Sequence, residues 1–286
     1  MGLLNRILGG GEETIARARR PQELAASLGR PALEGLEWLG RRPSRRAPLL
    51  YRLLVTVSEL VLYRLCAIRL RVVGRENLPQ GGYILAAAIH RNWIDPLVVL
   101  RALPREPRPW FMGGAPTVFD RRWKERLLHR LGGFLPVWRG GADVGVHIAA
   151  ASAVIEEEAV LVLFFEGAVS GPPDRVAPAS RAGAGLLALR TGAPIVPFAL
   201  AGTRELYRGK RIGVRILPAV TLAELLGEEW PPVPPPPGTR DELRLAHRIT
   251  RRLAERIDPE LPALLAWSED PPHTPRRWRW LSRLLR

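Results

Sequence analysis

The chain has 286 residues, of which 47% are hydrophobic and 25% are charged, a balance typical of one large globular domain with terminal additions and not of a disordered chain. Its 43 basic against 28 acidic residues give a net charge of +15, which favours an anionic partner: nucleic acid, anionic lipid or a phosphorylated substrate. The single cysteine, Cys66, excludes an intrachain disulfide.

The N-terminal part of the chain predicts an arm followed by an apolar helix. Residues 1–46 contain short amphipathic pieces interrupted by glycines, and no long apolar core of a cleavable signal peptide is present. Residues 47–68 predict a helix. Charged residues divide its apolar sequence into runs much shorter than the ~18 residues that a membrane span needs. Two compatible placements stay open for this helix: on a membrane interface or packed across the core.

The next part, residues 69–228, predicts a single α/β domain. Short apolar runs alternate with helical stretches, which indicates a mostly central, seven-stranded mixed sheet flanked by helices. The predicted strands are 69–74, 83–89, 108–113, 134–138, 160–165, 194–200 and 212–217. The predicted helices are 96–102, 121–131, 142–157 and 181–191.

The C-terminal part predicts further helices after a proline-rich linker. The linker, residues 229–240, marks the predicted end of the core because its prolines fit neither a helix nor a central strand. Residues 241–286 then predict C-terminal helices. On a helical wheel of 276–286, arginines lie opposite tryptophans and leucines, the pattern of an amphipathic helix on an anionic membrane. The alternative is a solvated terminal helix with some tryptophan packed on the domain.

Two residues with catalytic chemistry flank the turn after the predicted strand 83–89. His90 ends this strand, and Asp95 stands before Pro96, where its carboxylate is expected to accept from first-turn N–H groups. Both side chains would lie at one end of the sheet, where open α/β folds place their chemistry. Imidazole titrates near neutral pH, and a carboxylate fixes its tautomer. The alternatives are a histidine satisfied by the backbone and a plain helix cap.

Four motifs in a fixed order resemble those of the glycerolipid acyltransferases, a family typified by lysophosphatidate acyltransferases. The first is His90 with Asp95 after four intervening residues. The other three are GFLPVWR at 133–139, FFEGAVS at 164–170 and PIVP at 194–197. The resemblance covers about residues 70–218 and implies an O-acyltransferase with His90 as general base and Asp95 orienting it. A Gly-x-Ser-x-Gly elbow is absent from the sequence, so we expect direct attack by the acceptor.

The resemblance also implies which residues bind substrate: Arg139, Glu166, Gly167 and Arg181. Arginine at the position of Arg139 is associated with the acceptor's phosphate in the family, while a plain surface arginine is the alternative. Glu166 ends the most apolar strand and is expected to orient the acceptor or another site residue. Ala168 and Val169 stand where the family has Thr-Arg, and this departure leaves the identity of the acceptor open.

The implied reaction moves a fatty acyl group from acyl-CoA or acyl carrier protein to the hydroxyl of a lysolipid acceptor, and lysophosphatidate is the acceptor that we expect. We expect an anionic membrane surface as partner, a peripheral or monotopic position on the cytoplasmic face, and no nucleic acid, cofactor or metal. A catalytically degenerate lipid-binding protein of the same fold is an alternative. A basic nucleic-acid-binding protein is another, although the sequence lacks helix-turn-helix and RNA-binding signatures.

Overall fold

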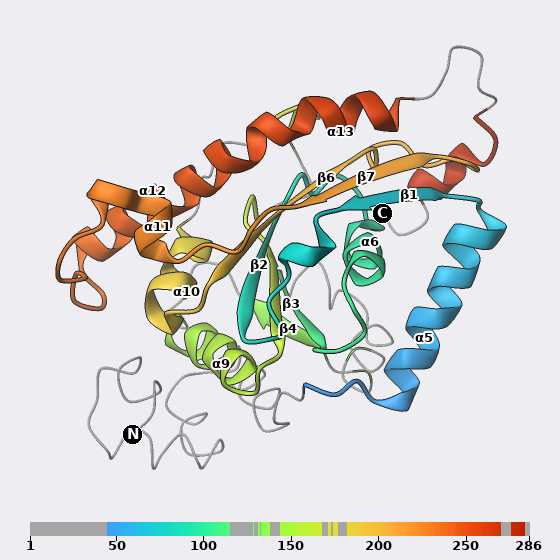
Figure 1. The fold of residues 1–286 in the computed structure, drawn as a ribbon. Helices are drawn as coiled ribbons and strands as arrows, with labels where there is room; N and C mark the ends of the chain where they lie inside the picture. The colour runs from blue at the N-terminus through green and yellow to red at the C-terminus, as the bar shows by residue number, and fades with distance from the viewer. Residues whose placement is uncertain are drawn as a thin grey trace.

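The computed structural model describes residues 45–114, 128, 131, 133–137, 144–167, 171–172, 174–176, 182–269 and 276–283. These residues form one seven-stranded sheet with helices on both of its faces (Figure 1). The predicted N-terminal arm falls outside the described residues except for its last two positions. So does the predicted helix 121–131, of which only residues 128 and 131 are described.

The sheet confirms the predicted α/β fold. Its strands follow the order β1-β7-β6-β2-β5-β3-β4. Their bounds are β1 (Arg69–Val73), β2 (Tyr83–Ala88), β3 (Pro109–Gly114), β4 (Phe134–Val137), β5 (Val160–Phe164), β6 (Ile195–Ala201) and β7 (Arg211–Ile216). All pairs of these strands are parallel except β6 with β7, so the sheet is mixed as predicted. Each predicted strand corresponds to an observed one, with ends that differ by one residue at most.

The helices include most of those expected from the sequence. They are α5 (Leu49–Glu59), α6 (Asp95–Ala102), α9 (Val144–Glu156), α10 (Gly183–Thr191), α11 (Leu222–Leu226), α12 (Arg240–Ile257) and α13 (Leu261–Ser268). Short 3₁₀ turns are η2 (Arg75–Asn77), η3 (Gly227–Glu229), η4 (Asp258–Glu260) and η5 (Arg279–Arg283). A π-helical segment, η1 (Leu60–Leu65), continues α5. None of the described helices is both long and apolar enough to cross a bilayer.

The central strand β2 explains how the core divides into two layers. Alternate side chains of a strand point to opposite faces. Ile84, Ala86 and Ala88 accordingly pack with α9, α10, α12 and α13 on one face. Tyr83 and Leu85 pack on the other face with α6 and η1. All six residues of β2 are buried, as expected for a parallel strand covered on both sides.

The prediction that the core ends at the proline-rich linker is wrong. Helix α12, which follows the linker, buries Leu245, Ile249, Leu253 and Ile257 in the same core as α9 and α10. Gly185 of α10 lies so close to α12 that a Cβ atom there would come within 2.0 Å of the Ala246 carbonyl oxygen. The prolines therefore form a surface connection between two parts of one core, and the apolar stripe of α12 is what brings the chain back to the sheet.

The C-terminal tail also differs from the prediction. Residues 276–283, the described part of the expected amphipathic helix, form a turn and the short 3₁₀ helix η5. Trp278 has a φ of +66°, which interrupts any continuous α-helix. Leu281 is buried in the second core layer, and Ser282 bonds to the backbone of Leu206. Packing of this leucine against the domain thus replaces the expected amphipathic helix over the described residues.

Candidate active site

The turn after β2 begins with an unusual backbone conformation. Ile89 has a φ of +66°, a region that β-branched residues rarely adopt and that is typical of functional sites when it occurs. The chain changes direction here, and the backbone N–H of His90 donates to Glu166 Oε2 at 2.9 Å. Because β2 and β5 are parallel neighbours, His90 and Glu166 lie at the same carboxyl edge of the sheet.

His90 and Asp95 form the pair that the sequence predicts. Nδ1 of His90 lies 2.7 Å from Oδ2 of Asp95, and the imidazole stacks on the ring of Phe164 at a centroid distance of 4.1 Å. The Asp95 side chain is fully buried, while that of His90 is 17% exposed. An ionised carboxylate only accepts hydrogen bonds, so it holds the proton on Nδ1 and leaves the Nε2 lone pair available as a base.

Asp95 begins the helix but does not cap it as predicted. Ile94 is the N-cap of α6, and no side-chain cap is present. The Asp95 carboxylate instead points back to the preceding turn, where Oδ2 accepts from the N–H groups of Arg91 at 2.6 Å and Asn92 at 2.8 Å. The prediction of first-turn capping is wrong because Asp95 is itself the first helical residue. Its carboxylate therefore fixes the turn and the imidazole together.

Arg91 and Glu166 form a second buried pair beneath the histidine. Nη1 and Nη2 of Arg91 each donate to one Glu166 oxygen at 2.9 Å, and the two side chains are 4% and 1% exposed. The remaining guanidinium donors reach the carbonyl oxygens of His90 and Pro172. A bidentate pair with its other donors satisfied is the arrangement in which a buried ion pair is tolerated.

The pair clarifies the role of Glu166. Of the two roles expected from the sequence, the geometry fits the positioning of another site residue, because both carboxylate oxygens contact the turn that carries His90. Arg91 was not among the predicted site residues. Its signal was a basic residue directly after His90 together with an acid at the end of a strand, but only the strand order shows that the two meet.

Of the other three predicted substrate-binding residues, the structure describes only Gly167. Gly167 has a φ of +74°, and its N–H donates to the Phe164 carbonyl in the turn that ends β5. Arg139 and Arg181 lie outside the described residues, as do Ala168 and Val169. Within the part of the chain that the structure describes, no group of three His, Cys, Asp or Glu side chains comes together in a way that would hold a metal ion.

The candidate site lies in a segment that resembles known proteins. Residues 69–201 match the family model described as Acyltransferase. The segment that carries the candidate site is therefore similar to the proteins of this acyltransferase family. The matched segment runs from β1 to the end of β6 and contains His90, Asp95 and Glu166. The family resemblance stated from the motifs is thus confirmed over this segment, whereas β7 and the C-terminal helices lie beyond it.

A solved structure shares the fold of this chain. It is that of the 1-acyl-sn-glycerophosphate acyltransferase PlsC from Thermotoga maritima, with a TM-score of 0.50 and 18% sequence identity. The match covers 75% of this chain and 80% of that one. At this identity the likeness concerns the fold.

Proposed function

We propose that this protein is a peripheral membrane O-acyltransferase that moves a fatty acyl group from acyl-CoA or acyl carrier protein to the hydroxyl of a lysolipid, with lysophosphatidate as the first acceptor to test. The observation that carries the proposal is the His90–Asp95 pair at the end of β2, inside the segment that matches the family. The family assignment favours this activity over the nucleic-acid-binding alternative.

The proposed chemistry uses the free nitrogen of His90. The acceptor hydroxyl donates to Nε2, which takes the proton as the oxygen attacks the thioester carbonyl carbon. A C–O bond forms, the C–S bond breaks, and the departing thiolate takes the proton from the imidazolium. Asp95 stabilises the imidazolium through Nδ1, and a general base of this kind contributes about 10²- to 10⁴-fold in rate.

The identity of both substrates is part of the proposal. The Thermotoga maritima protein is named for 1-acyl-sn-glycerophosphate, which makes a phosphorylated lysolipid the first acceptor to test. The changed third motif, with Ala168 and Val169, makes non-phosphorylated lysolipids the necessary comparison. Acyl-CoA and acyl carrier protein remain equal candidates for the donor.

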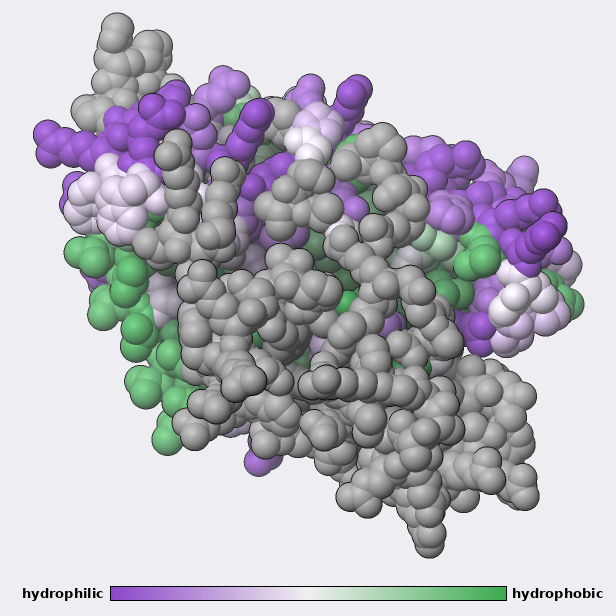
Figure 2. All heavy atoms as spheres, turned by 180° about the vertical axis from the view of Figure 1, so that it is seen from behind, coloured by the Kyte–Doolittle hydropathy of each residue, from purple (hydrophilic) through white to green (hydrophobic). Residues whose placement is uncertain are grey.

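An exposed apolar face supports the membrane position. Large hydrophobic side chains of α5 and η1 face solvent, and most of them follow one another at helical spacing: Leu49, Leu50, Leu53, Val57, Leu60, Val61 and Leu65. Figure 2 shows them as a hydrophobic band along the edge of the molecule formed by these helices, at the left of that view. Tyr51, Val55 and Leu62 on the opposite side are buried against the domain.

This arrangement lets both predicted placements of the helix hold together. One side of α5 and η1 packs on the core, and the other presents leucines at the surface, Leu49 being 83% exposed. An amphipathic helix with such a face binds in the interface of a bilayer. The net charge of +15 adds attraction to anionic lipids.

The decisive experiment measures transfer of a labelled acyl group by purified protein to lysophosphatidate, glycerol 3-phosphate and monoacylglycerol. His90→Ala is expected to lose transfer to every acceptor while its thermal unfolding stays close to that of the wild type. His247→Ala, at an exposed position of α12, is the matched control. Undiminished transfer by His90→Ala would refute the proposed mechanism. A wild type that binds lysolipids without transferring an acyl group would identify the degenerate lipid-binding alternative instead.

A further inference from the structure

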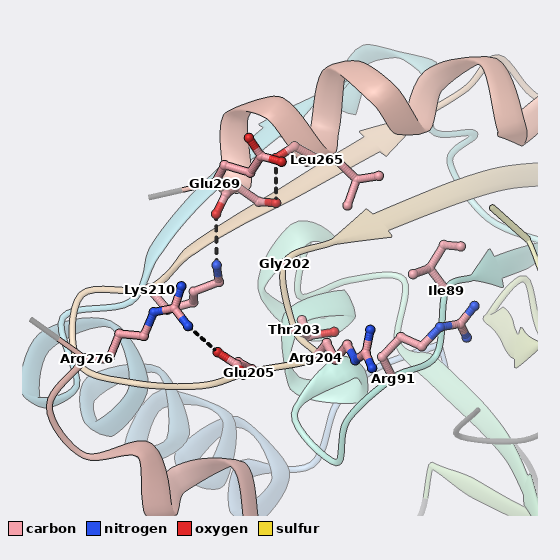
Figure 3. Close-up of a pocket in the computed structure, with 11 residues that line it drawn as sticks. Ile89, Arg91, Gly202, Thr203, Arg204, Glu205, Lys210, Leu265, Glu269 and Arg276 are labelled. Atoms are coloured by element: carbon pink, nitrogen blue, oxygen red, sulfur yellow. Dashed lines mark hydrogen bonds and ion pairs between the residues drawn. The ribbon is translucent and has the colours of Figure 1, made fainter. Parts of the chain in front are cut away.

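A cavity of about 310 Å³ lies beside the turn that carries His90 (Figure 3). Four segments contribute to its lining: the turn after β2, the loop between β6 and β7, which includes Lys210, the end of α13, and the C-terminal tail with Arg276. The lining residues are Ile89, Arg91, Gly202, Thr203, Arg204, Glu205, Lys210, Leu265, Ser268, Glu269 and Arg276. Ile89 and Arg91 flank His90 directly, so the cavity adjoins the catalytic turn.

The position of the cavity follows from the sheet. β2 and β6 are parallel neighbours, with Ala88 opposite Ala199. Both strands therefore end at the same edge of the sheet, and the loop 202–205 lies beside the turn 89–91. His90 stacks on Phe164 of β5, on the other side of β2. The imidazole of His90 and the cavity thus lie on opposite sides of β2 at the same edge of the sheet.

A buried hydroxyl lines the cavity without a partner. Thr203 is 1% exposed, and its Oγ1 has no hydrogen-bond partner among the described residues. Burial of an unpaired polar group is unfavourable, so a hydrogen bond from this hydroxyl to a water or a ligand in the adjoining cavity would be favourable. A hydroxyl that faces a cavity is able to donate to an anionic oxygen placed there.

The charges around Thr203 favour an anion. Arg204 follows it on the same exposed loop and has no ion pair within the described residues. Arg276 also lines the cavity and donates to Glu205 at 2.9 Å. Four basic side chains line the cavity against two carboxylates, those of Glu205 and Glu269. The guanidinium of Arg204 is thus available for an incoming anion.

Lys210 is a further basic residue that lines the cavity. Its ammonium donates to the Ser268 carbonyl oxygen at 2.8 Å. Burial lowers the pKa of this ammonium and the nearby positive charge of Arg276 lowers it further, while the carboxylates of Glu205 and Glu269 act in the opposite direction. An anion bound in the cavity would offset both effects, because opposite charge at close range favours the protonated form of a lysine.

We propose that this cavity binds a phosphate group of a substrate, with the Thr203 hydroxyl and the Arg204 guanidinium as its direct contacts and with Lys210 and Arg276 supplying further positive charge. The assignment of that phosphate to an acyl-transfer substrate rests on the proposed function, but its binding does not require turnover. Two sources carry the required chemistry: the phosphate monoester of a lysolipid acceptor, and the phosphates of a coenzyme A donor.

The test measures binding by titration calorimetry with two probes, a short-chain lysophosphatidate and coenzyme A, each beside a counterpart without phosphate: the matching monoacylglycerol and pantetheine. Thr203→Val and Arg204→Gln are expected to raise the Kd of one phosphate probe at least tenfold and to leave its counterpart unchanged. Thr203→Ser, which keeps the hydroxyl, is expected to bind like the wild type. Arg248→Gln, at an exposed position of α12 outside the cavity, controls for the loss of one charge.

The probe whose binding weakens in the Thr203 and Arg204 variants identifies the source of the phosphate. If binding of lysophosphatidate weakens, the cavity holds the phosphate of the acceptor. If binding of coenzyme A weakens, the cavity holds a phosphate of the donor. Wild-type affinity of Thr203→Val and Arg204→Gln for both probes, or failure of the wild type to bind either probe, would overturn the inference. A third result is possible: the wild type transfers no acyl group, but its phosphate binding depends on Thr203. That result would refute the proposed function and leave the phosphate site standing. Thermal unfolding of each variant verifies that it folds.

Discussion

The guanidinium of Arg91 and the carboxylate of Glu166 form a buried, bidentate ion pair that joins the turn after β2 to the end of β5. The same carboxylate accepts from the backbone N–H of His90, and the same guanidinium donates to the His90 carbonyl. The pair therefore holds both backbone groups of the proposed catalytic residue. The Asp95 carboxylate holds the imidazole of His90 and the backbone N–H groups of Arg91 and Asn92.

Removal of one charge from this ion pair is expected to destabilise the protein strongly. Glu166→Gln leaves the buried Arg91 without a counter-charge, and breaking a buried pair costs about 3–5 kcal/mol. Urea unfolding measures this loss as a lower free energy of unfolding. The double variant Arg91→Met/Glu166→Leu is expected to recover part of that free energy, because it buries no charge.

Activity separates a positioning role from a purely structural one. The double variant is expected to keep a low kcat despite its recovered stability, because the His90 backbone has lost its two contacts with Arg91 and Glu166. A double variant with wild-type kcat would show that the pair contributes only to stability. The exposed pair of Arg244 and Asp241 on α12 provides a control, since its removal is expected to change the free energy of unfolding by about 1 kcal/mol or less.

Asp95→Asn is expected to lower kcat by about 10²- to 10⁴-fold, because an amide neither fixes the productive tautomer of His90 nor stabilises the imidazolium. The KM values are expected to change little. Initial rates over a pH series measure the effect, and Asp241→Asn on the exposed face of α12 is the control. A kcat within threefold of the wild type would contradict the role of Asp95 as the partner of the base.

The packing of the C-terminal tail also has a measurable consequence. The indole N–H of Trp93, inside the turn between His90 and Asp95, donates to the carbonyl of Leu281 at 3.0 Å. Leu281 is buried, and replacing a buried leucine by alanine costs about 2–5 kcal/mol. Leu281→Ala is therefore expected to lower the free energy of unfolding measured in urea. Trp280→Ala, at an exposed position of the same segment, is expected to change it little, and equal losses for both would contradict the packing.

The sequence predicts the fold well because each strand has a local signal. The run of apolar residues in β2 and the turn residues around each strand are visible without knowledge of any contact, and the match of all seven strands follows from them. The prediction of an amphipathic helix in the C-terminal tail is wrong for the opposite reason. The helical wheel of 276–286 describes only local periodicity, whereas the burial of Leu281 depends on a core that distant residues form.

The same distinction applies to the site. His90 and Asp95 are five positions apart, so a motif shows them together, and their contact at 2.7 Å agrees. Arg91 and Glu166 are 75 positions apart, and their contact depends on β5 lying next to β2. No periodicity in the sequence gives that neighbour relation. Thr203 was missed for the same reason, because its burial beside the His90 turn depends on β6 lying on the other side of β2.

Membrane binding is expected to depend on the apolar face of α5 and η1. Transfer of a leucine side chain out of water contributes about 1.5–3 kcal/mol when its burial is complete, so Leu53→Gln/Leu60→Gln is expected to weaken binding by at least tenfold. Flotation with vesicles that contain anionic phospholipid measures the bound fraction. Leu243→Gln, at an exposed position of α12, tests whether any exposed leucine has this effect.

Salt separates the apolar part of this binding from the electrostatic part. Attraction between the charge of +15 and anionic lipid weakens as ionic strength rises, whereas burial of leucine does not. The wild type is therefore expected to retain more binding at high salt than Leu53→Gln/Leu60→Gln. Equal loss of binding for both proteins at high salt would show that charge alone attaches the protein, and that the apolar face of α5 and η1 does not enter the bilayer.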